Sequence, residues 1–133
     1  LAEINGVNAL TDVTGFGLAG HLTEIMAASA LDADINWSQI PTLPNLEYYV
    51  EEECVPGGTG RNYTSIKKHL PPLNPTQRAI LCDPQTSGGL LVTAQPEAVD
   101  HVSKVLKDAG LPFSPIGRLN KQVNEQASLK LSD

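Results

Sequence analysis

The sequence has few basic residues and no long hydrophobic run, and each shortage excludes a class of function. Nine Lys and Arg residues stand against 15 Asp and Glu, which gives a formal net charge of -6. Because a nucleic-acid backbone is bound by clustered Lys and Arg, this balance argues against a nucleic-acid partner. No apolar run approaches the roughly 20 residues that cross a bilayer, and no basic segment precedes an apolar one at the N-terminus. We therefore expect neither a membrane partner nor an export signal.

Cysteine is also scarce, and the usual patterns of covalent catalysis are missing. Cys54 and Cys82 form neither a CxxC pair nor a metal pattern with the scattered histidines. We interpret them as free thiols of a reducing compartment, which predicts a cytoplasmic protein. No serine has a GxSxG context, and acidic residues cluster only in EEE at 51–53, which we interpret as a solvated helix end. The chain thus offers no catalytic nucleophile or acid–base pair of its own.

The hydrophobic pattern predicts a single domain of the α+β class. A chain of 133 residues that is 41% hydrophobic and 18% charged can bury one core without disulfides. Amphipathic helices alternate with short apolar strands, which predicts an α/β sandwich with a mixed β-sheet and helices packed on one face. Strands are expected at 7–13, 32–37, 90–94 and 113–119, with a marginal strand at 128–131. Helices are expected at 18–30, 45–53, 76–81 and 97–109, and CVPGGTGRNY at 54–63 is expected to be a loop.

The stretch TDVTGFGLAGH, residues 11–21, places a carboxylate and three glycines where a strand gives way to a helix. Glycines at such a junction let a ligand approach the backbone closely. Asp12 has two interpretations there. It can cap the helix, a role for which Thr14 competes, or it can hold Mg²⁺, which takes one or two carboxylates and leaves its other positions to water and phosphates.

Two further glycine-rich stretches are candidate anion sites. PGGTGRN at 56–62 lacks the GK[ST] end of a Walker loop, so a plain turn-rich connection competes with anion binding there. QTSGG at 85–89 can form an anion-binding nest of amides, or a bulge or close backbone packing before a buried strand. The candidate contacts are Gly57, Gly58, Thr59, Arg61, Thr86, Ser87 and Gly88.

Together, and in this order, TDVTGFGLAGH, PGGTGRN and CDPQTSGGLL resemble the C-terminal half of the selenophosphate synthetase (selenide, water dikinase) family. The resemblance runs from about residue 7 to about residue 119. That family belongs to the superfamily of aminoimidazole ribonucleotide synthetase, whose subunits pair an N-terminal ATP-handling domain with a C-terminal α/β domain. The resemblance implies that residues 1–133 are such a C-terminal domain, excised from a longer chain that forms a homodimer.

The resemblance also implies a reaction and a role for the first motif. ATP, selenide and water would give selenophosphate, AMP and phosphate, with Mg²⁺ neutralising the polyphosphate. The metal-binding aspartate of the family matches Asp12, and Thr14, Gly15 and Gly17 would approach the nucleotide. The nucleophilic Cys or selenocysteine, the essential Lys and the other metal-binding aspartates of the family have no counterpart here, so we expect this chain alone to be inactive. The alternatives are another member of the superfamily, such as a thiamine-phosphate kinase relative, or a non-catalytic binding or assembly module.

Overall fold

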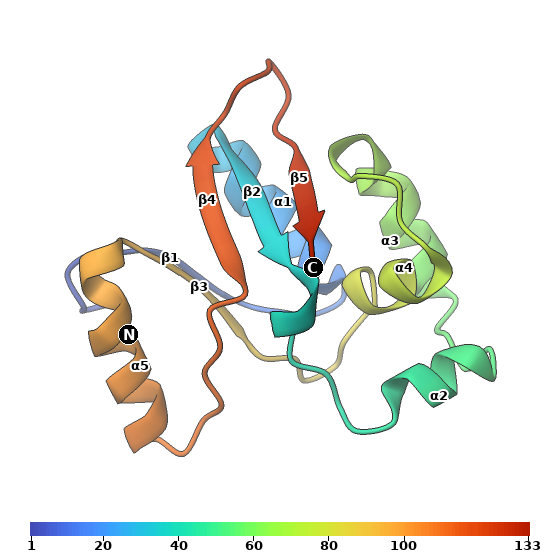
Figure 1. Ribbon diagram of the computed structural model, residues 1–133, viewed down its shortest axis with the longest axis horizontal. Coiled ribbons are helices and arrows are strands. Elements are labelled where there is room, and N and C mark those ends of the chain that lie inside the picture. Colours follow the sequence, from blue (N-terminus) through green and yellow to red (C-terminus); the bar gives the residue numbers. More distant parts are fainter.

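The computed structural model describes residues 1–133 and divides their strands between two sheets (Figure 1). The central sheet has the order β4-β2-β5, and a separate two-stranded sheet pairs β1 with β3. β2 runs antiparallel to β4 and parallel to β5, so the central sheet is mixed, as the sequence predicts. The strands are β1 (Val7–Asp12), β2 (Leu31–Asn36), β3 (Leu90–Ala94), β4 (Gly117–Lys121) and β5 (Leu129–Ser132).

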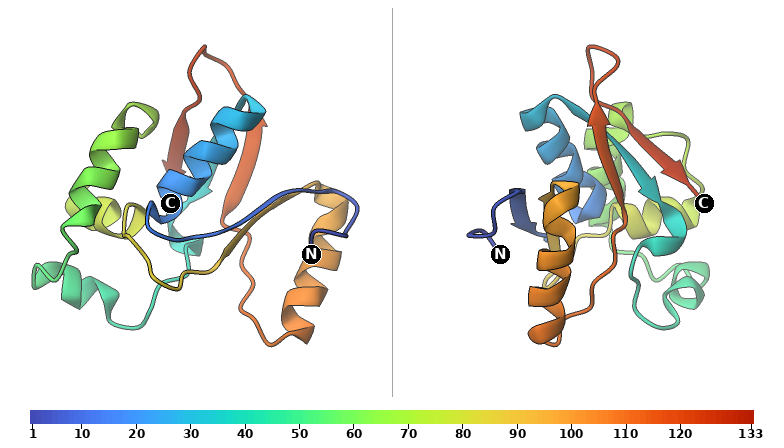
Figure 2. Two further views of the ribbon diagram at one scale, coloured as in Figure 1. Left: turned by 180° about the vertical axis from the view of Figure 1, so that it is seen from behind. Right: turned by 60° about the vertical axis from the view of Figure 1, so that its left-hand side comes forward.

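Helix α1 (Gly17–Ser29) covers one face of the central sheet and supplies much of the core. Its Leu22 and Met26 are buried with Ala33 and Ile35 of β2, which alternate with polar residues along that strand. The alternation gives β2 one apolar face toward α1 and one polar face away from it. The expected packing of helices on one face is therefore present (Figure 2).

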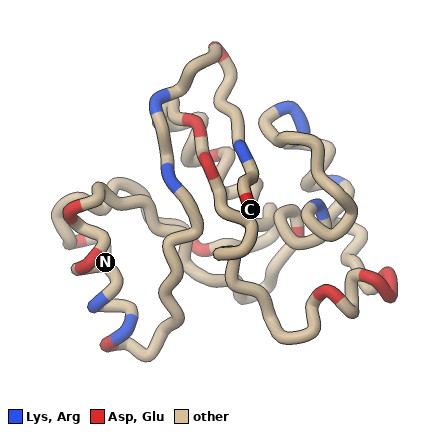
Figure 3. The backbone as a smooth tube through the Cα atoms, viewed as in Figure 1, with Lys and Arg blue, Asp and Glu red and all other residues tan.

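The other face of the central sheet is open and charged. In the strand register, Asp34 of β2 lies beside Arg118 of β4 on one side and Lys130 of β5 on the other. Figure 3 shows this as an acidic position flanked by basic positions on the neighbouring strands. Opposite charges on adjacent strands favour this register over one shifted by a residue.

The β1–β3 ribbon leads from the centre of the molecule to helix α5 (Val99–Asp108). Figure 2 shows α5 at the far end of the ribbon, away from the other helices. Val102 and Leu106 form the buried face of α5, which matches the apolar stripe of the sequence. A 3-10 turn at Pro96–Ala98 precedes the helix, so the expected helix at 97–109 is present with a tighter start.

On the opposite side lie three short helices, two of which pack against α1 while the other packs against one of these two. They are α2 (Leu46–Glu51), α3 (Gly58–Ile66) and α4 (Pro75–Leu81). α4 begins with a full capping box, in which Asn74 and Gln77 each bond the other's backbone amide, and Pro75 occupies the first turn. No helix in the structure is long and apolar enough to span a membrane.

Two boundaries expected from the sequence are wrong. The loop expected at 54–63 ends at Gly57, because α3 starts at Gly58 although two of its first three residues are glycines with low helix propensity. Its tertiary contacts override that propensity, with Thr59 buried and Asn62 bonded to two other segments. The strand expected at 113–119 begins only at Gly117, because Pro112 and Pro115 have no N–H to donate to a sheet.

Asp32 holds together the long connection between β4 and β5. Its carboxylate accepts hydrogen bonds from the backbone N–H of Ser128 at 2.7 Å and of Val123 at 3.1 Å, and from the Ser128 hydroxyl at 3.2 Å. These bonds, led by the one from the Ser128 amide, lower the pKa of Asp32 below its ordinary 3.8. The charged form of Asp32 is therefore favoured by folding.

We expect the free energy of unfolding to fall as the pH drops below about 3.8, in part because Asp32 becomes protonated. The sign follows from the lowered pKa: the contribution is complete above the unfolded value and is lost as pH falls through the folded value. Chemical denaturation of wild type and Asp32→Asn between pH 3 and pH 7 should show a smaller acid-induced loss in the variant. Asp100→Asn, on the exposed first turn of α5, is the control and should retain the acid-induced loss of wild type.

Candidate functional site

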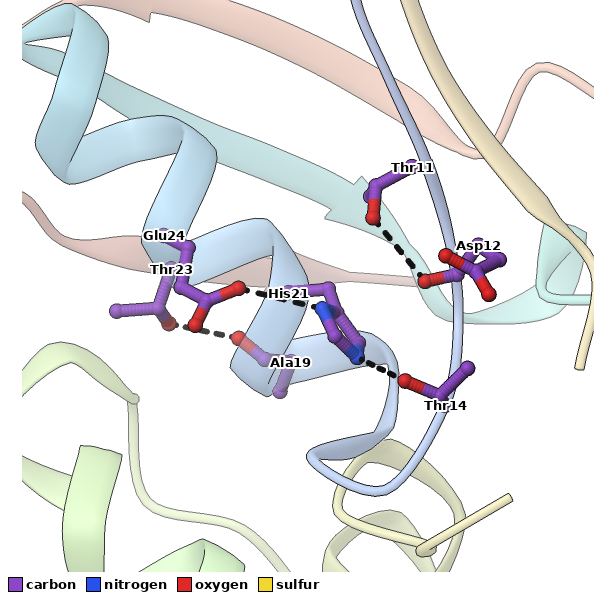
Figure 4. Close-up of polar contacts among 7 residues, drawn as sticks. All are labelled: Thr11, Asp12, Thr14, Ala19, His21, Thr23 and Glu24. Carbon is purple, nitrogen blue, oxygen red and sulfur yellow. Dashed lines mark hydrogen bonds and ion pairs between the residues drawn. The ribbon is translucent and has the colours of Figure 1, made fainter. Parts of the chain in front are cut away.

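Asp12 ends β1 with a free carboxylate. Residues of β1 alternate between half-buried and exposed, and this alternation turns Asp12 outward. Its carboxylate accepts no hydrogen bond from the protein, although the neighbouring Thr11 hydroxyl donates to the backbone carbonyl of Asp12 at 3.2 Å. In Figure 4 no dashed contact joins this carboxylate to the side chains drawn around it. Both features leave it available to a ligand.

The capping role that competes for Asp12 is absent. The N-cap of α1 is Phe16, and no side chain caps the helix, so neither Asp12 nor Thr14 does so. Instead the chain turns through Gly17, whose φ of +74° is a left-handed conformation, and the Gly17 amide donates to the carbonyl of Thr14 at 3.0 Å. The helix therefore starts by a backbone turn, which explains one of the glycines in TDVTGFG.

The third motif is joined to the first at several points. Asp12 is paired with Leu90, and the Val13 amide donates to the carbonyl of Gly89 at 2.8 Å. A Cβ at Gly88 would overlap the carbonyl oxygen of Val13, so only glycine fits there. Of the two sequence interpretations of QTSGG, close backbone packing is therefore present at Gly88.

The backbone of the helix-start turn packs against the chain just before the third motif's glycines. The Gln85 amide donates to the carbonyl of Thr14 at 3.1 Å. A Cβ at Gly17 would lie 2.9 Å from the carbonyl carbon of Cys82 and from the carbonyl oxygen of Asp83. The first and third motifs thus form one compact unit.

The second motif joins this unit through Asn62, at the middle of α3. The side-chain amide of Asn62 donates to the carbonyl of Gly15 at 2.8 Å and to that of Cys82 at 3.0 Å. A Cβ at Gly58 would stand 2.9 Å from Pro84, so α3 also presses closely on the third motif. We call residues 11–21, 56–62 and 82–90 the glycine-rich junction, since all three stretches meet there.

The predicted anion contacts are spread unevenly over the junction. Gly57, Gly58, Thr59 and Arg61 lie on the first turn of α3 and its N-cap. The Thr59 hydroxyl is buried without a hydrogen-bond partner, whereas Arg61 is exposed and forms no ion pair. Thr86 and Ser87 are exposed and their side chains make no hydrogen bond to the other motifs.

Three side chains form a hydrogen-bonded line beside Asp12 (Figure 4). The Thr14 hydroxyl lies 3.1 Å from Nε2 of His21, and Nδ1 of His21 lies 3.2 Å from the Glu24 carboxylate. His21 is buried and its ring contacts the tilted ring of Phe16, whereas Glu24 is exposed. The spacing of His21 and Glu24 brings them together on one side of α1.

The titratable groups of the third motif are shielded from water. Burial raises the pKa of the Cys82 thiol to about 11, so it remains a neutral thiol rather than a nucleophile. Burial also raises the pKa of Asp83. Cys54 is exposed and free, so no disulfide links the two. No group of three or more His, Cys, Asp or Glu is arranged to hold a metal ion in this chain.

Sequence reasoning missed Asn62, His21 and Glu24 as members of the site. Asn62 belongs to PGGTGRN, which the sequence predicts to be a loop. A loop residue is not expected to bridge two other motifs, as Asn62 does. A signal for the other pair existed, because a histidine and a glutamate three positions apart on an expected helix lie side by side.

Asn62→Ala is expected to lower the free energy of unfolding by about 2 kcal/mol, because it removes two hydrogen bonds to partly enclosed carbonyls. Thermal denaturation measures the loss. Thr64→Ala is the control, since its hydroxyl bonds only the Gly60 carbonyl of the same helix on an exposed surface. Equal stability of the two variants would contradict the role of Asn62 as a clamp.

The chain matches a protein-family model and is similar in sequence to several known proteins. The family model described as "AIR synthase related protein, C-terminal domain" matches residues 1–130. A selenide, water dikinase of Photorhabdus laumondii is 44% identical over 132 residues, which are 99% of this chain and 38% of that protein. A selenide, water dikinase of a Shewanella species is 58% identical over 98 residues, or 74% of this chain and 28% of that protein.

Among solved structures, thiamine monophosphate kinase from Aquifex aeolicus is similar at a TM-score of 0.45 and 14% identity, over 96% of this chain and 32% of that one. The chain spans about a third of the length of the curated relatives it matches.

Proposed function

We propose that this chain, which belongs to the family of C-terminal domains of AIR synthase related proteins, is the C-terminal part of a selenide, water dikinase. The complete protein would convert ATP, selenide and water into selenophosphate, AMP and phosphate. It would act in the cytoplasm as a homodimer. The observation that carries the proposal is the free carboxylate of Asp12 at the edge of the glycine-rich junction.

Asp12 fits one position in the coordination shell of Mg²⁺. A carboxylate that accepts no protein hydrogen bond and points outward is a suitable oxygen ligand, and Mg²⁺ is usually held by one or two carboxylates plus phosphates and water. When bound, Mg²⁺ would neutralise charge on the polyphosphate of ATP. The remaining protein ligands would come from an N-terminal ATP-handling domain of the same polypeptide.

The rest of the junction would fix the position of Asp12. The pairing of Asp12 with Leu90, the turn at Gly17 and the hydrogen bonds of Asn62 connect the backbone around Asp12 to neighbouring elements. A well-held ligand keeps its geometry when phosphates approach, which is what catalysis by positioning requires. Gly15 leaves open space where a Cβ would stand, so a nucleotide can approach its backbone.

Two alternatives are less well supported. Another member of the same superfamily would share the fold, but the curated relatives at 44% and 58% identity are all named as selenide, water dikinases. A non-catalytic binding or assembly module does not require an exposed carboxylate beside glycines that are fixed by close backbone contacts. A purified complete protein with selenide-dependent activity separates these alternatives from the proposal.

The isolated chain, residues 1–133, is expected to produce no AMP from ATP and selenide in the presence of Mg²⁺. A single carboxylate cannot assemble the reaction, since Cys82 is buried as a neutral thiol and the exposed Cys54 lies outside the glycine-rich junction. Chromatographic assay of AMP compares the chain with the complete protein at equal concentration. Robust turnover by the chain alone would contradict the proposed division between the two domains.

A further inference from the structure

The two hydrogen bonds that join Thr14, His21 and Glu24 determine whether the Thr14 hydroxyl donates or accepts. A carboxylate only accepts hydrogen bonds, so the contact of 3.2 Å between Glu24 and Nδ1 of His21 requires a proton on Nδ1. In a neutral imidazole the other nitrogen then carries a lone pair. Nε2 therefore accepts the proton of the Thr14 hydroxyl across 3.1 Å.

The environment of His21 supports one fixed arrangement. The ring is buried, and Phe16 stands against it with the ring centroids 5.7 Å apart. The hydrogen-bonding groups that meet the imidazole are the Thr14 hydroxyl and the Glu24 carboxylate, and each engages a different nitrogen. A buried ring with both nitrogens engaged has a defined tautomer and orientation.

We infer that His21, oriented by Glu24, is a positioning residue that makes the Thr14 oxygen a hydrogen-bond acceptor at the site of Asp12. The Thr14 hydroxyl has one proton and donates it to His21, so only lone pairs remain for a ligand. A phosphate oxygen also offers only lone pairs and would be repelled. The partner that fits is a hydrogen-bond donor, and a water molecule of a hydrated divalent cation held by Asp12 would supply one.

This inference rests on the proposed function, and it changes one expectation from the sequence. Thr14 was expected to approach the nucleotide itself. With its proton directed at His21, it is instead suited to the cation that accompanies the nucleotide. Removal of Glu24 should therefore weaken the response to Mg²⁺ without a matching change in the response to ATP.

The tautomer of His21 is measurable in the chain without metal or nucleotide. We expect nitrogen-15 NMR at pH 8.5, where imidazoles are ordinarily neutral, to show a proton on Nδ1 and none on Nε2 of His21. Glu24→Ala removes the acceptor from an exposed position and should shift the ring toward the Nε2–H tautomer without unfolding the chain. An Nε2–H tautomer in the wild type, or a ring with both nitrogens protonated, would overturn the inference.

Kinetics of the complete protein test the cation. Glu24→Ala should raise the Mg²⁺ concentration for half-maximal activity by about tenfold while the KM for ATP at saturating Mg²⁺ stays within about twofold, the range found for residues that orient metal ligands. Thr14→Val should act similarly, and the double variant should be no worse than Thr14→Val alone, because Glu24 acts through Thr14. Glu97→Ala, exposed and outside the junction, is the matched control.

The outcomes separate the inference from the proposed function. Additive effects of the two variants, or a shift in KM for ATP rather than in the Mg²⁺ response, would overturn the inference even in an active protein. Absence of selenide-dependent AMP formation in the wild-type complete protein would contradict the proposed function and with it the cation contact. The NMR measurement would still decide the direction of the Thr14 hydroxyl.

Discussion

Asp12→Asn in the complete protein is expected to lower selenide-dependent AMP formation by about a hundredfold or more. The loss of a charged Mg²⁺ ligand removes several kcal/mol of charge stabilisation from the transition state. A barrier increase of roughly 1.36 kcal/mol lowers the rate tenfold. The same change should leave the free energy of unfolding almost unaltered, because the carboxylate is exposed and accepts no protein hydrogen bond. Initial rates of AMP formation, measured beside thermal denaturation, test both parts.

Asp100→Asn is the matched control for Asp12→Asn. Asp100 is exposed on the first turn of α5, at the far end of the ribbon from the junction, and its amide variant should retain wild-type activity. Full activity of Asp12→Asn would remove Asp12 from the metal site. Loss of activity through unfolding would assign it a structural role instead.

Gly17→Ala is expected to lower the free energy of unfolding by about 3 kcal/mol. The left-handed φ of +74° is strained for alanine, and the new methyl would stand 2.9 Å from backbone atoms of Cys82 and Asp83, which cannot rotate away. Urea denaturation of the chain measures the loss. The effect should extend to activity in the complete protein, because Gly17 connects the first motif to the third.

Gly15→Ala, two positions earlier, is the control within the same motif. Gly15 is not left-handed and has no atom within 4 Å of an added Cβ, so the stability of this variant should stay within about 0.5 kcal/mol of wild type. Comparable losses at Gly15 and Gly17 would mean that general flexibility, rather than close packing, explains the glycines of TDVTGFG.

The sequence predicted those parts of the fold whose causes are local. The apolar stripe of α5, the alternation along β2 and the strand at 90–94 each follow from spacing within one segment, and all are present. The marginal strand at 128–131 is also confirmed, as β5. The sequence did not predict helix α3, because its stability comes from the hydrogen bonds of Asn62 to distant segments and from the burial of Thr59, which no local pattern contains.

The candidate site was predictable to the extent that motifs mark it. TDVTGFGLAGH indicated Asp12, and the order of the three motifs indicated a shared role. The spacing of the motifs in the sequence did not show that they contact one another in the fold. Their contact depends on tertiary pairs such as Asn62 with Gly15 and Gly88 with Val13. The separate β1–β3 sheet was likewise not anticipated, since strand partners far apart in sequence have no local signature.

Phosphorus-31 NMR of the complete protein supplied with ATP, selenide and Mg²⁺ tests the proposed reaction and the role of Asp12 together. We expect selenophosphate, AMP and orthophosphate to appear together in equal amounts, all three to require selenide, and Asp12→Asn to abolish them at wild-type stability. Formation of ADP in place of AMP, or turnover of ATP that is indifferent to selenide and to Asp12, would contradict the proposed function.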